Sequence, residues 1–268
     1  MYDFKLTSWR GRFGVTLKQI CTGIYVAKET KSRLTIPKHF LPTVLSETVW
    51  DFSETTPLKK MNTEFWGKQT DVGWQLFQTL NPDKFATEQN ALCQQYILPK
   101  LLPYKKTELP YDLVVHLRGG DVFRAGKPHC AYVQSPISYF QKIIDVEKPK
   151  KTLLVCEDKR NPMYELIPDY TDCDVRVAEK LEDDINLILN AKTLVSGGIS
   201  NFVGWLALCS ERLERLYIPE YGKRHQVQGR LHEVFVAKHN NYIQYGKWRV
   251  DHKLMATHNK KDIIIDKI

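Results

Sequence analysis

The part of this chain from Asp112 onward alternates between short apolar runs and segments with helical spacing. The runs predict strands at 112–118, 153–155, 175–178, 193–195 and 216–219. Helices are predicted from Ser135 and Pro136, after Asn161 and Pro162, and between Asp183 and Lys192. Alternation of this kind predicts a parallel sheet that is covered by helices on both faces. Ligands bind such sheets at the carboxyl ends of the strands.

The amino-terminal part predicts a second α/β unit. Phe4 and Leu6 indicate a short strand, Leu17, Ile20 and Ile24 recur at helical spacing, and a second strand is predicted at 34–36. The segment 37–80 is predicted as loops and short helices, 84–98 as a helix, and 103–110 as a linker. We therefore expect an α/β protein of two Rossmann-like domains, 1–110 and 111–268.

The sequence HLRGGD at 116–121 follows the apolar run 113–115, so one strand delivers His116, Arg118 and two glycines to a single turn. Glycines let a backbone approach a ligand closely and supply amide donors, and a guanidinium binds two phosphate oxygens at once. The turn therefore predicts a pyrophosphate site. The alternative is an ordinary turn with an exposed charge.

Two further turns open helices. Gly11, Arg12 and Gly14 precede the first helix, and a helix start favours anions, although close packing explains the glycines equally well. Residues 196–202 form a serine- and glycine-rich turn after a predicted strand. Ser196, Ser200 and Asn201 either bind phosphate and ribose there or only cap the helix.

Three ordered segments resemble the superfamily of α1,2-, α1,6- and protein O-fucosyltransferases. HLRGGD resembles its H-x-R-x-G-D motif, and GRFGVTLKQ resembles its opening G-x-x-G-x-x-x-x-Q segment. The stretch DINLILNAKTLVSGGISNFVGWLAL is similar to its third motif, so the resemblance extends from about Gly11 to Pro219. It implies a GT-B architecture, with two Rossmann-like domains facing a cleft, an inverting transfer from GDP-fucose, and no obligatory metal.

The chain departs from that pattern at several positions. Gly119 stands where many bacterial α1,2-fucosyltransferases have a second arginine, and Val15 and Thr16 stand where they have an Asn-Gln pair. The third motif reads ISNFV at 199–203 where they have Ser-Thr-Phe-Ser. Fucose is therefore the favoured donor sugar, with xylose or another sugar as the alternative.

Departure of a nucleoside diphosphate leaves negative charge on the phosphate, which needs cations or backbone donors. Arg118 is predicted to fill this role, in a donor site completed by Ser200, Asn201 and Phe202. Glu157 or Asp158, after the strand at 153–156, is a candidate for the base or ribose, and the alternative is an exposed surface acid.

An inverting transfer also needs a general base for the acceptor hydroxyl, and the candidates are Asp121 and His129. Asp121 has the alternative role of holding the arginine turn. Tyr132 and Gln134, just after His129, are candidates for contacts with the acceptor sugar. His116 lies within the strand and is also expected to hold the turn in place.

The 268 residues carry a net charge of +8 with a pI near 9.0, but the basic residues are scattered and form no stripe. A nucleic-acid partner is therefore not expected, and such a protein would bind polynucleotides with strong salt dependence. A non-catalytic nucleotide-sugar or glycan-binding module is a further alternative, which would show no turnover. The basic tail beyond 220 is predicted as helical packing or a solvated appendage.

The six cysteines show neither a CxxC pair nor His/Cys metal spacing, so no disulfide framework and no zinc site are expected. No window approaches about 20 apolar residues, and the amino terminus does not resemble a signal peptide. These features favour the cytoplasm. A Golgi or endoplasmic reticulum location would require an anchor upstream of this sequence.

Overall fold

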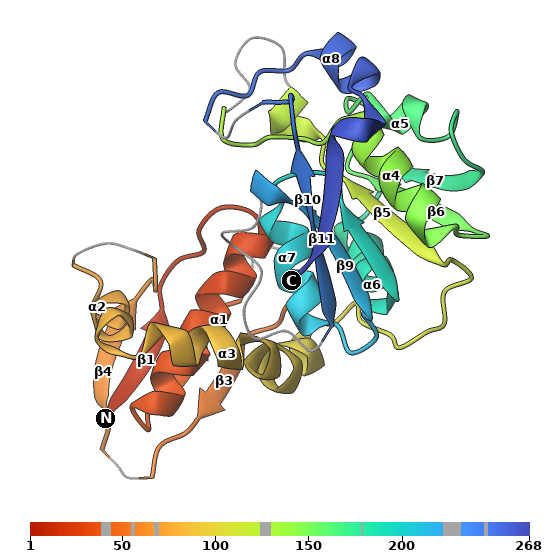
Figure 1. Ribbon diagram of the computed structural model, residues 1–268. Coiled ribbons are helices and arrows are strands. Elements are labelled where there is room, and N and C mark those ends of the chain that lie inside the picture. Colours follow the sequence, from red (N-terminus) through yellow and green to blue (C-terminus); the bar gives the residue numbers. More distant parts are fainter. Residues whose placement is uncertain are drawn as a thin grey trace. The chain divides into compact units, whose positions relative to one another are not determined.

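A computed structural model of the chain describes residues 1–38, 44–54, 57–66, 70–123, 130–177, 179–221, 232–243 and 246–268 (Figure 1). The chain divides into two compact units. The first covers Met1–Tyr104, and the second begins at Lys105 and holds the remaining described residues. Each unit has a mainly parallel sheet with helices, which confirms the predicted α/β class. The cleft between the two units stays a prediction.

The first unit contains a four-stranded sheet in the order β3–β2–β1–β4. Its strands are β1 (Tyr2–Leu6), β2 (Arg33–Ile36), β3 (Thr48–Asp51) and β4 (Lys59–Thr63). Strand β1 runs parallel to β2 and β4, and α1 (Phe13–Glu29) connects β1 to β2, so the predicted βαβ opening is confirmed. The prediction of loops and short helices for 37–80 is wrong where β3 and β4 form. In β3 exposed residues alternate with buried ones, and β4 is largely exposed, so neither strand has an apolar run.

Helices complete the first unit after β4. They are α2 (Val72–Thr79), α3 (Pro82–Leu92), the π-helical turn η1 (Cys93–Ile97) and the 3-10 turn η2 (Leu98–Lys100). The Asn81 side chain accepts hydrogen bonds from the amides of Asp83 and Lys84, and Pro82 occupies the first helical position. The helix predicted at 84–98 is therefore confirmed, with a start two residues earlier.

The second unit contains a seven-stranded sheet in the order β11–β10–β9–β8–β5–β6–β7. Its strands are β5 (Leu113–Leu117), β6 (Thr152–Cys156), β7 (Cys173–Val177), β8 (Thr193–Ser196), β9 (Arg215–Pro219), β10 (Glu233–His239) and β11 (Ile263–Lys267). All neighbours are parallel except β10 and β11. Strands β10 and β11 overturn the prediction of a helical or solvated tail, because their valine, phenylalanine and isoleucine side chains extend the sheet beyond β9.

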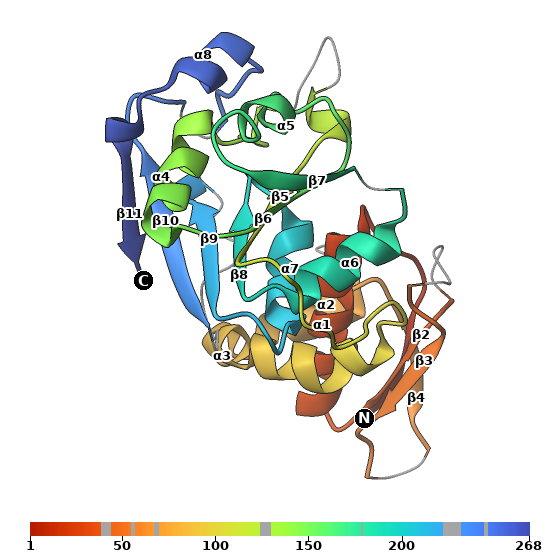
Figure 2. The same ribbon diagram turned by 90° about the vertical axis from the view of Figure 1, so that its right-hand side faces the viewer.

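Helices cover both faces of the second sheet. They are α4 (Ile137–Glu147), α5 (Met163–Leu166), α6 (Leu181–Asn190), α7 (Asn201–Cys209) and α8 (His252–Thr257), with the 3-10 turns η3 (Gly120–Phe123) and η5 (Lys260–Asp262). Right-handed crossovers place α4 and α5 on one face and α6 and α7 on the other, where α6 and α7 pack together (Figure 2). Strands β5, β6 and β8 are consequently buried along their whole length. Among the described residues, no helix combines the length and apolar character needed to cross a bilayer.

Substitution of Gly73 in α2 tests the packing of the first unit. An added Cβ would lie 2.2 Å from the hydroxyl oxygen of Thr63 and 2.5 Å from the ring of Phe65. Because buried side chains must shift to make room, we expect Gly73→Ala to lower the free energy of unfolding by about 1–3 kcal/mol. Gln78→Ala on the exposed side of the same helix is the control, with a change within about 0.5 kcal/mol. Equal thermal unfolding of the two variants would contradict this packing.

Candidate functional site

The strand order of the second sheet changes direction between β5 and β8. From β5 the chain continues to β6 and β7 on one side, then returns to β8 on the other side of β5 and continues to β9. Doubly wound sheets bind ligands at such a switch point, at the carboxyl ends of the two strands. His116 pairs with Ser196 at these ends, so the turns 118–121 and 197–200 lie beside each other and form the candidate site.

Arg118 connects the two turns. Its Nη1 donates to the carbonyl of Ile199 at 3.3 Å, and its Nη2 lies 3.2 and 3.3 Å from the two carboxylate oxygens of Asp121. The guanidinium carbon lies 4.4 Å from the ring centre of Tyr132, and only 14% of the side chain is exposed. The buried Nε has no hydrogen-bond partner in the part of the chain that the structure describes. A buried donor without a partner is costly, so this position favours an acceptor from a ligand.

The two glycines after Arg118 are held by acids from the turn after β6. The Gly119 amide donates to Glu157 at 3.1 Å, and the Gly120 amide donates to Asp158 at 2.9 Å. A Cβ at Gly119 would lie 2.3 Å from a carboxylate oxygen of Asp158, and Gly120 has a φ of +58°. The glycines therefore serve the close approach of these acids. The amides predicted for a pyrophosphate are bonded to carboxylates instead.

Asn161 supports the same turn, and the sequence indicated only a helix start at this position. It is 1% exposed, and its side-chain amide donates to the carbonyl of Arg118 at 3.1 Å. Its carbonyl oxygen accepts from the Met163 amide at 3.1 Å. Together with Asp121, it fixes both ends of the Arg118 residue.

The two serines of the turn after β8 bond to nearby residues, while its backbone bonds to His116 and to the segment 133–135. The Ser196 hydroxyl donates to the carbonyl of Gly198 at 2.8 Å, and Ser200 caps α7 by accepting from the Val203 amide at 3.5 Å. A Cβ at Gly197 would lie 2.8 Å from the carbonyl oxygen of His116. Ser196 therefore shapes the turn. Capping by Ser200 and ligand binding at the helix start are compatible.

His116 is buried at the end of β5, with its ring 5.4 Å from that of Phe202. Burial, reinforced by the charge of Arg118, lowers the pKa of His116 to about 4. The imidazole is therefore neutral near pH 7, and its Nδ1 has no hydrogen-bond partner among the described residues. Phe202 and the half-buried Asn201 form the first turn of α7 beside this histidine.

The predicted acceptor residues are placed differently. Tyr132 stacks on Arg118, whereas Gln134 is fully buried and donates through its Nε2 to the carbonyls of Tyr132 and Val133. A Cβ at Gly198 would lie 2.4 Å from the Gln134 Oε1, so this amide fills the interior. The structure therefore gives Gln134 a packing role rather than a surface for an acceptor sugar. His129 lies outside the described residues.

Asp184 is a buried acid within the helix that the sequence predicts between Asp183 and Lys192. It lies in the first turn of α6, is 4% exposed, and its Oδ1 has no hydrogen-bond partner in the described part of the chain. Burial raises the pKa of Asp184 to about 7, an effect that Arg176 opposes and the nearby Glu157 strengthens. The signal in the sequence was its spacing with Ile185 and Ile188 on the buried face.

In the first unit, Gly11, Arg12 and Gly14 lie where α1 begins, after the carboxyl end of β1. Gly11 has a φ of +60°, which favours glycine, and a Cβ there would lie 3.2 Å from Val15. Gly14 is buried in the first turn of α1, and the exposed Arg12 is the residue immediately before this helix. Both explanations of this turn, helix packing and an anion site, therefore stay open.

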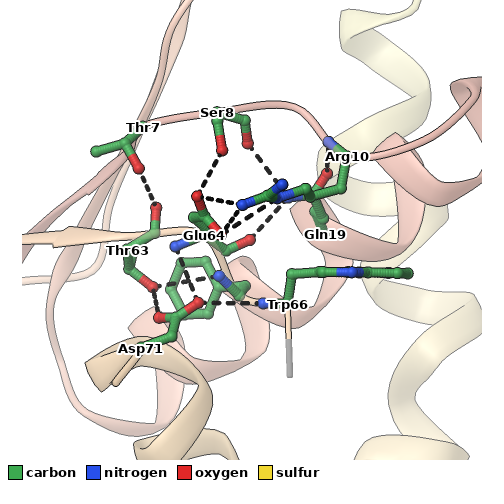
Figure 3. A network of polar contacts seen from close by, with 9 residues as sticks. Thr7, Ser8, Arg10, Gln19, Thr63, Glu64, Trp66 and Asp71 are labelled. Carbon is green, nitrogen blue, oxygen red and sulfur yellow. Dashed lines mark hydrogen bonds and ion pairs between the residues drawn. The ribbon is translucent and has the colours of Figure 1, made fainter. Parts of the chain in front are cut away.

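Gln19, the last residue of the GRFGVTLKQ segment, ties two loops of the first unit together (Figure 3). It is buried, accepts from the Arg10 amide at 2.8 Å, and donates to the carbonyls of Glu64 at 2.7 Å and Ser8 at 3.3 Å. The Glu64 carboxylate accepts from the Arg10 guanidinium at 2.6 Å and from the Ser8 hydroxyl at 2.9 Å. The loops after β1 and β4 are therefore held as one polar surface at the carboxyl edge of this sheet.

Asp71 holds the other side of the same loop (Figure 3). It is 7% exposed and accepts from the Thr63 hydroxyl at 2.5 Å and from the amides of Glu64 at 3.0 Å and Trp66 at 3.2 Å. Glu64 therefore sits in a loop that is fixed from both ends.

No family model matches this chain, and no curated protein sequence matches it significantly. Among solved structures it is similar to POFUT1 in complex with GDP-fucose, at 10% identity over 81% of this chain and 98% of that chain, with a TM-score of 0.47. It is similar to the bacterial iron-containing dodecameric glycosyltransferase TibC from enterotoxigenic E. coli H10407, at 12% identity over 94% and 68%, with a TM-score of 0.49. It is similar to NodZ α-1,6-fucosyltransferase soaked with GDP-fucose, at 10% identity over 78% of this chain and 93% of that chain, with a TM-score of 0.39. These likenesses concern the fold alone.

The described residues contain no group of three or more His, Cys, Asp or Glu side chains arranged to hold a metal ion. The acids nearest Arg118 are bonded to donors of the protein: Asp121 to the guanidinium, and Glu157 and Asp158 to backbone amides. These acids therefore hold the arginine turn in place.

The pKa of Asp184 predicts a specific dependence of stability on pH. An aspartate titrates near ~3.9 in the unfolded chain, so the folded protein holds an extra proton between about pH 4 and pH 7. The contribution of Asp184 to stability is greatest below its pKa in the unfolded chain, and it is lost as the pH rises through its pKa in the folded protein. Relative to Asp184→Asn, the free energy of unfolding of the wild type should fall by up to roughly 4 kcal/mol over this range.

Chemical denaturation of both proteins from pH 4 to pH 8 measures this difference. The carbon-13 shift of the Asp184 carboxyl group supplies an independent titration curve. If the free energies of unfolding of the two proteins changed in parallel with pH, or if the carbon-13 shift were constant above pH 5, the Asp184 carboxyl group would not have the raised pKa that its burial predicts.

Proposed function

We propose that this chain is a glycosyltransferase that takes its sugar from a nucleoside-diphosphate donor. The observation that carries the proposal is Arg118, a largely buried guanidinium at the β5/β8 switch point whose Nε lacks a partner among the described residues. When the bond to the anomeric carbon breaks, negative charge develops on the departing phosphate. A guanidinium fixed in advance beside that phosphate stabilises the transition state more than the bound donor.

The remaining donor contacts are proposed from the residues around Arg118. The start of α7, with Asn201 and Phe202, offers a positive helix end to phosphate and ribose. Asp184 offers a carboxyl group, neutral or charged near pH 7, to the N–H groups of a base. Glu157 and Asp158 act indirectly, because they hold the arginine turn. Fucose is the sugar that the three motifs favour.

The transfer is proposed to invert the anomeric centre, with a side chain that accepts the proton of the acceptor hydroxyl. Asp121 shares both carboxylate oxygens with Arg118, so its proposed role is to orient the guanidinium. His129 is then the proposed general base, from its position in the sequence after the arginine turn.

The first unit is the proposed acceptor side. Its carboxyl edge presents the Arg10–Glu64 pair, whose side chains are 35% and 19% exposed. The same loop carries the half-buried Trp66, whose ring centre lies 5.5 Å from the Lys18 ammonium. Charged groups suit the hydroxyls of a glycan, and an aromatic ring suits its apolar face.

Substitution of Arg118 tests the function. A lysine keeps the charge but loses the planar fork that holds Ile199 and Asp121 and reaches a phosphate, so Arg118→Lys should lower kcat by about 100-fold or more. Arg160→Lys is the matched control, because Arg160 is 52% exposed and contacts the same turn through the carbonyl of Gly120. Its turnover should stay within a few-fold of the wild type.

The measurement is release of nucleoside diphosphate from GDP-, UDP-, CDP- and dTDP-sugars, with thermal shifts for donor binding. A ligand at 100 times its Kd raises stability by about 2.7 kcal/mol. If no donor of this set shifts the unfolding temperature or is turned over, the proposed function is wrong. Binding without turnover on any glycan would indicate a non-catalytic module.

Metal removal supplies a second test. Because the proposed stabiliser of the leaving phosphate is a guanidinium and a helix end, transfer should persist in EDTA with less than a twofold loss of rate. The control is the same assay after re-addition of Mg²⁺ or Mn²⁺. Loss of activity in EDTA that either ion restores would overturn the role of Arg118 as the main stabiliser.

A further inference from the structure

A groove of about 550 Å³ lies on the face of the second sheet that carries α4, away from the carboxyl ends of β5 and β8. Helix α4 lies alongside β10 and β11 (Figure 2). The residues that line the groove come from α4, η5 and strands β9 to β11. The groove is lined by Lys142, Val146, Tyr217, Phe235, Lys261, Ile263, Ile264, Ile265 and Lys267. Its volume falls within the range of small-molecule sites, about 300–1,000 Å³.

The wall of the groove is apolar. Tyr217 and Phe235 stack with their ring centres 4.7 Å apart and an angle of 14° between the planes. Phe235 is directly opposite Lys267 in the sheet, and Ile265 follows on the same face two residues away. Phe235 and Ile265 are only partly buried, and Val146 on the opposite side is 56% exposed. The groove therefore leaves apolar surface in contact with water.

Three lysines from three different elements stand around this apolar wall: Lys142 of α4, Lys261 of η5 and Lys267 of β11. Lys267 pairs with Glu233. Lys142 and Lys261 form no ion pair with any carboxylate of the described residues, whereas their neighbour Lys260 is paired with Asp145. Lys142 lies near Asp145, whose pKa its charge helps to lower, but neither ammonium group is held in an ion pair among the described residues. Both can therefore bind an anion beside the apolar wall.

We propose that this groove binds a single-chain lipid phosphate, with its alkyl chain along Phe235 and Ile265 and its phosphate between Lys142 and Lys261. Charge complementarity selects the anion, and the concave apolar wall selects one alkyl chain. A second copy of this chain on this face is an alternative occupant, which light scattering distinguishes from the lipid phosphate. This site is independent of the proposed transferase function.

Isothermal titration with dodecyl phosphate, below its critical micelle concentration, tests the proposal. The full chain should bind one molecule, and inorganic phosphate and the uncharged octaethylene glycol monododecyl ether should each bind at least about tenfold more weakly. Hydrogen–deuterium exchange should show protection of residues 263–267 only with dodecyl phosphate. Equal binding of the ether, or of phosphate alone, would overturn the joint recognition of chain and charge.

Variants locate the site. The double variant Lys142→Glu/Lys261→Glu reverses two charges and should weaken the binding of dodecyl phosphate by about tenfold or more. The control Lys150→Glu/Lys253→Glu makes the same change in net charge at exposed positions and should bind dodecyl phosphate like the wild type. Ile265→Glu should weaken binding, with Val175→Glu on the opposite edge strand as its control. The lysine variants leave the core unchanged, so they still test whether the groove is the binding site if Ile265→Glu does not fold.

Three results would reject the site. They are absence of binding to the wild type, equal effects of the two lysine pairs, and a dimer in light scattering whose contact protects residues 263–267 without ligand. None of them bears on donor binding at Arg118, which the nucleotide-sugar assay measures separately.

Discussion

The hydrogen bond from Arg118 to the carbonyl of Ile199 joins the two turns that follow β5 and β8, and the rest of the candidate site is built around it. Asp121 holds the other side of the guanidinium, and Asn161 holds the backbone carbonyl of the same residue. A side chain fixed in this way loses little conformational freedom when an anion arrives. Preorganisation of this kind is what makes a charged group effective in stabilising charge that develops during a reaction.

The centre of the second sheet could be predicted from the sequence because β5, β6 and β8 are buried on both faces, and a strand in that position needs an unbroken apolar run. Strand β4 was missed because it is largely exposed and has no such run. Strands β10 and β11 do contain short apolar runs, at 234–237 and 263–265, but the surplus charge of the surrounding region suggested a solvated tail. Their pairing depends on partners distant in sequence, which a local pattern does not contain.

The residues of the site were easier to predict than their partners. A strand followed by an arginine and two glycines places Arg118 on a turn, but nothing local shows that the Gly119 amide faces Glu157 across 38 residues. Gln134 was a candidate for contact with the acceptor sugar, yet its amide fills the space beside Gly198. Asp184 was interpreted as a helix-start acid, and its burial follows from tertiary packing on the same face as Ile185.

The pairing of Arg118 with Asp121 explains how one arginine can be both buried and available. The carboxylate holds the guanidinium at 3.2 Å, and its own side chain is 42% exposed. The diphosphate of the proposed donor would carry more charge than one carboxylate and would compete for the same Nη2 donor. Because Asp121 is open to solvent, water can hydrate it when it yields that donor, so the exchange costs little desolvation. In the proposed donor complex, the buried Nε, which Asp121 does not contact, would be the additional donor for the phosphate.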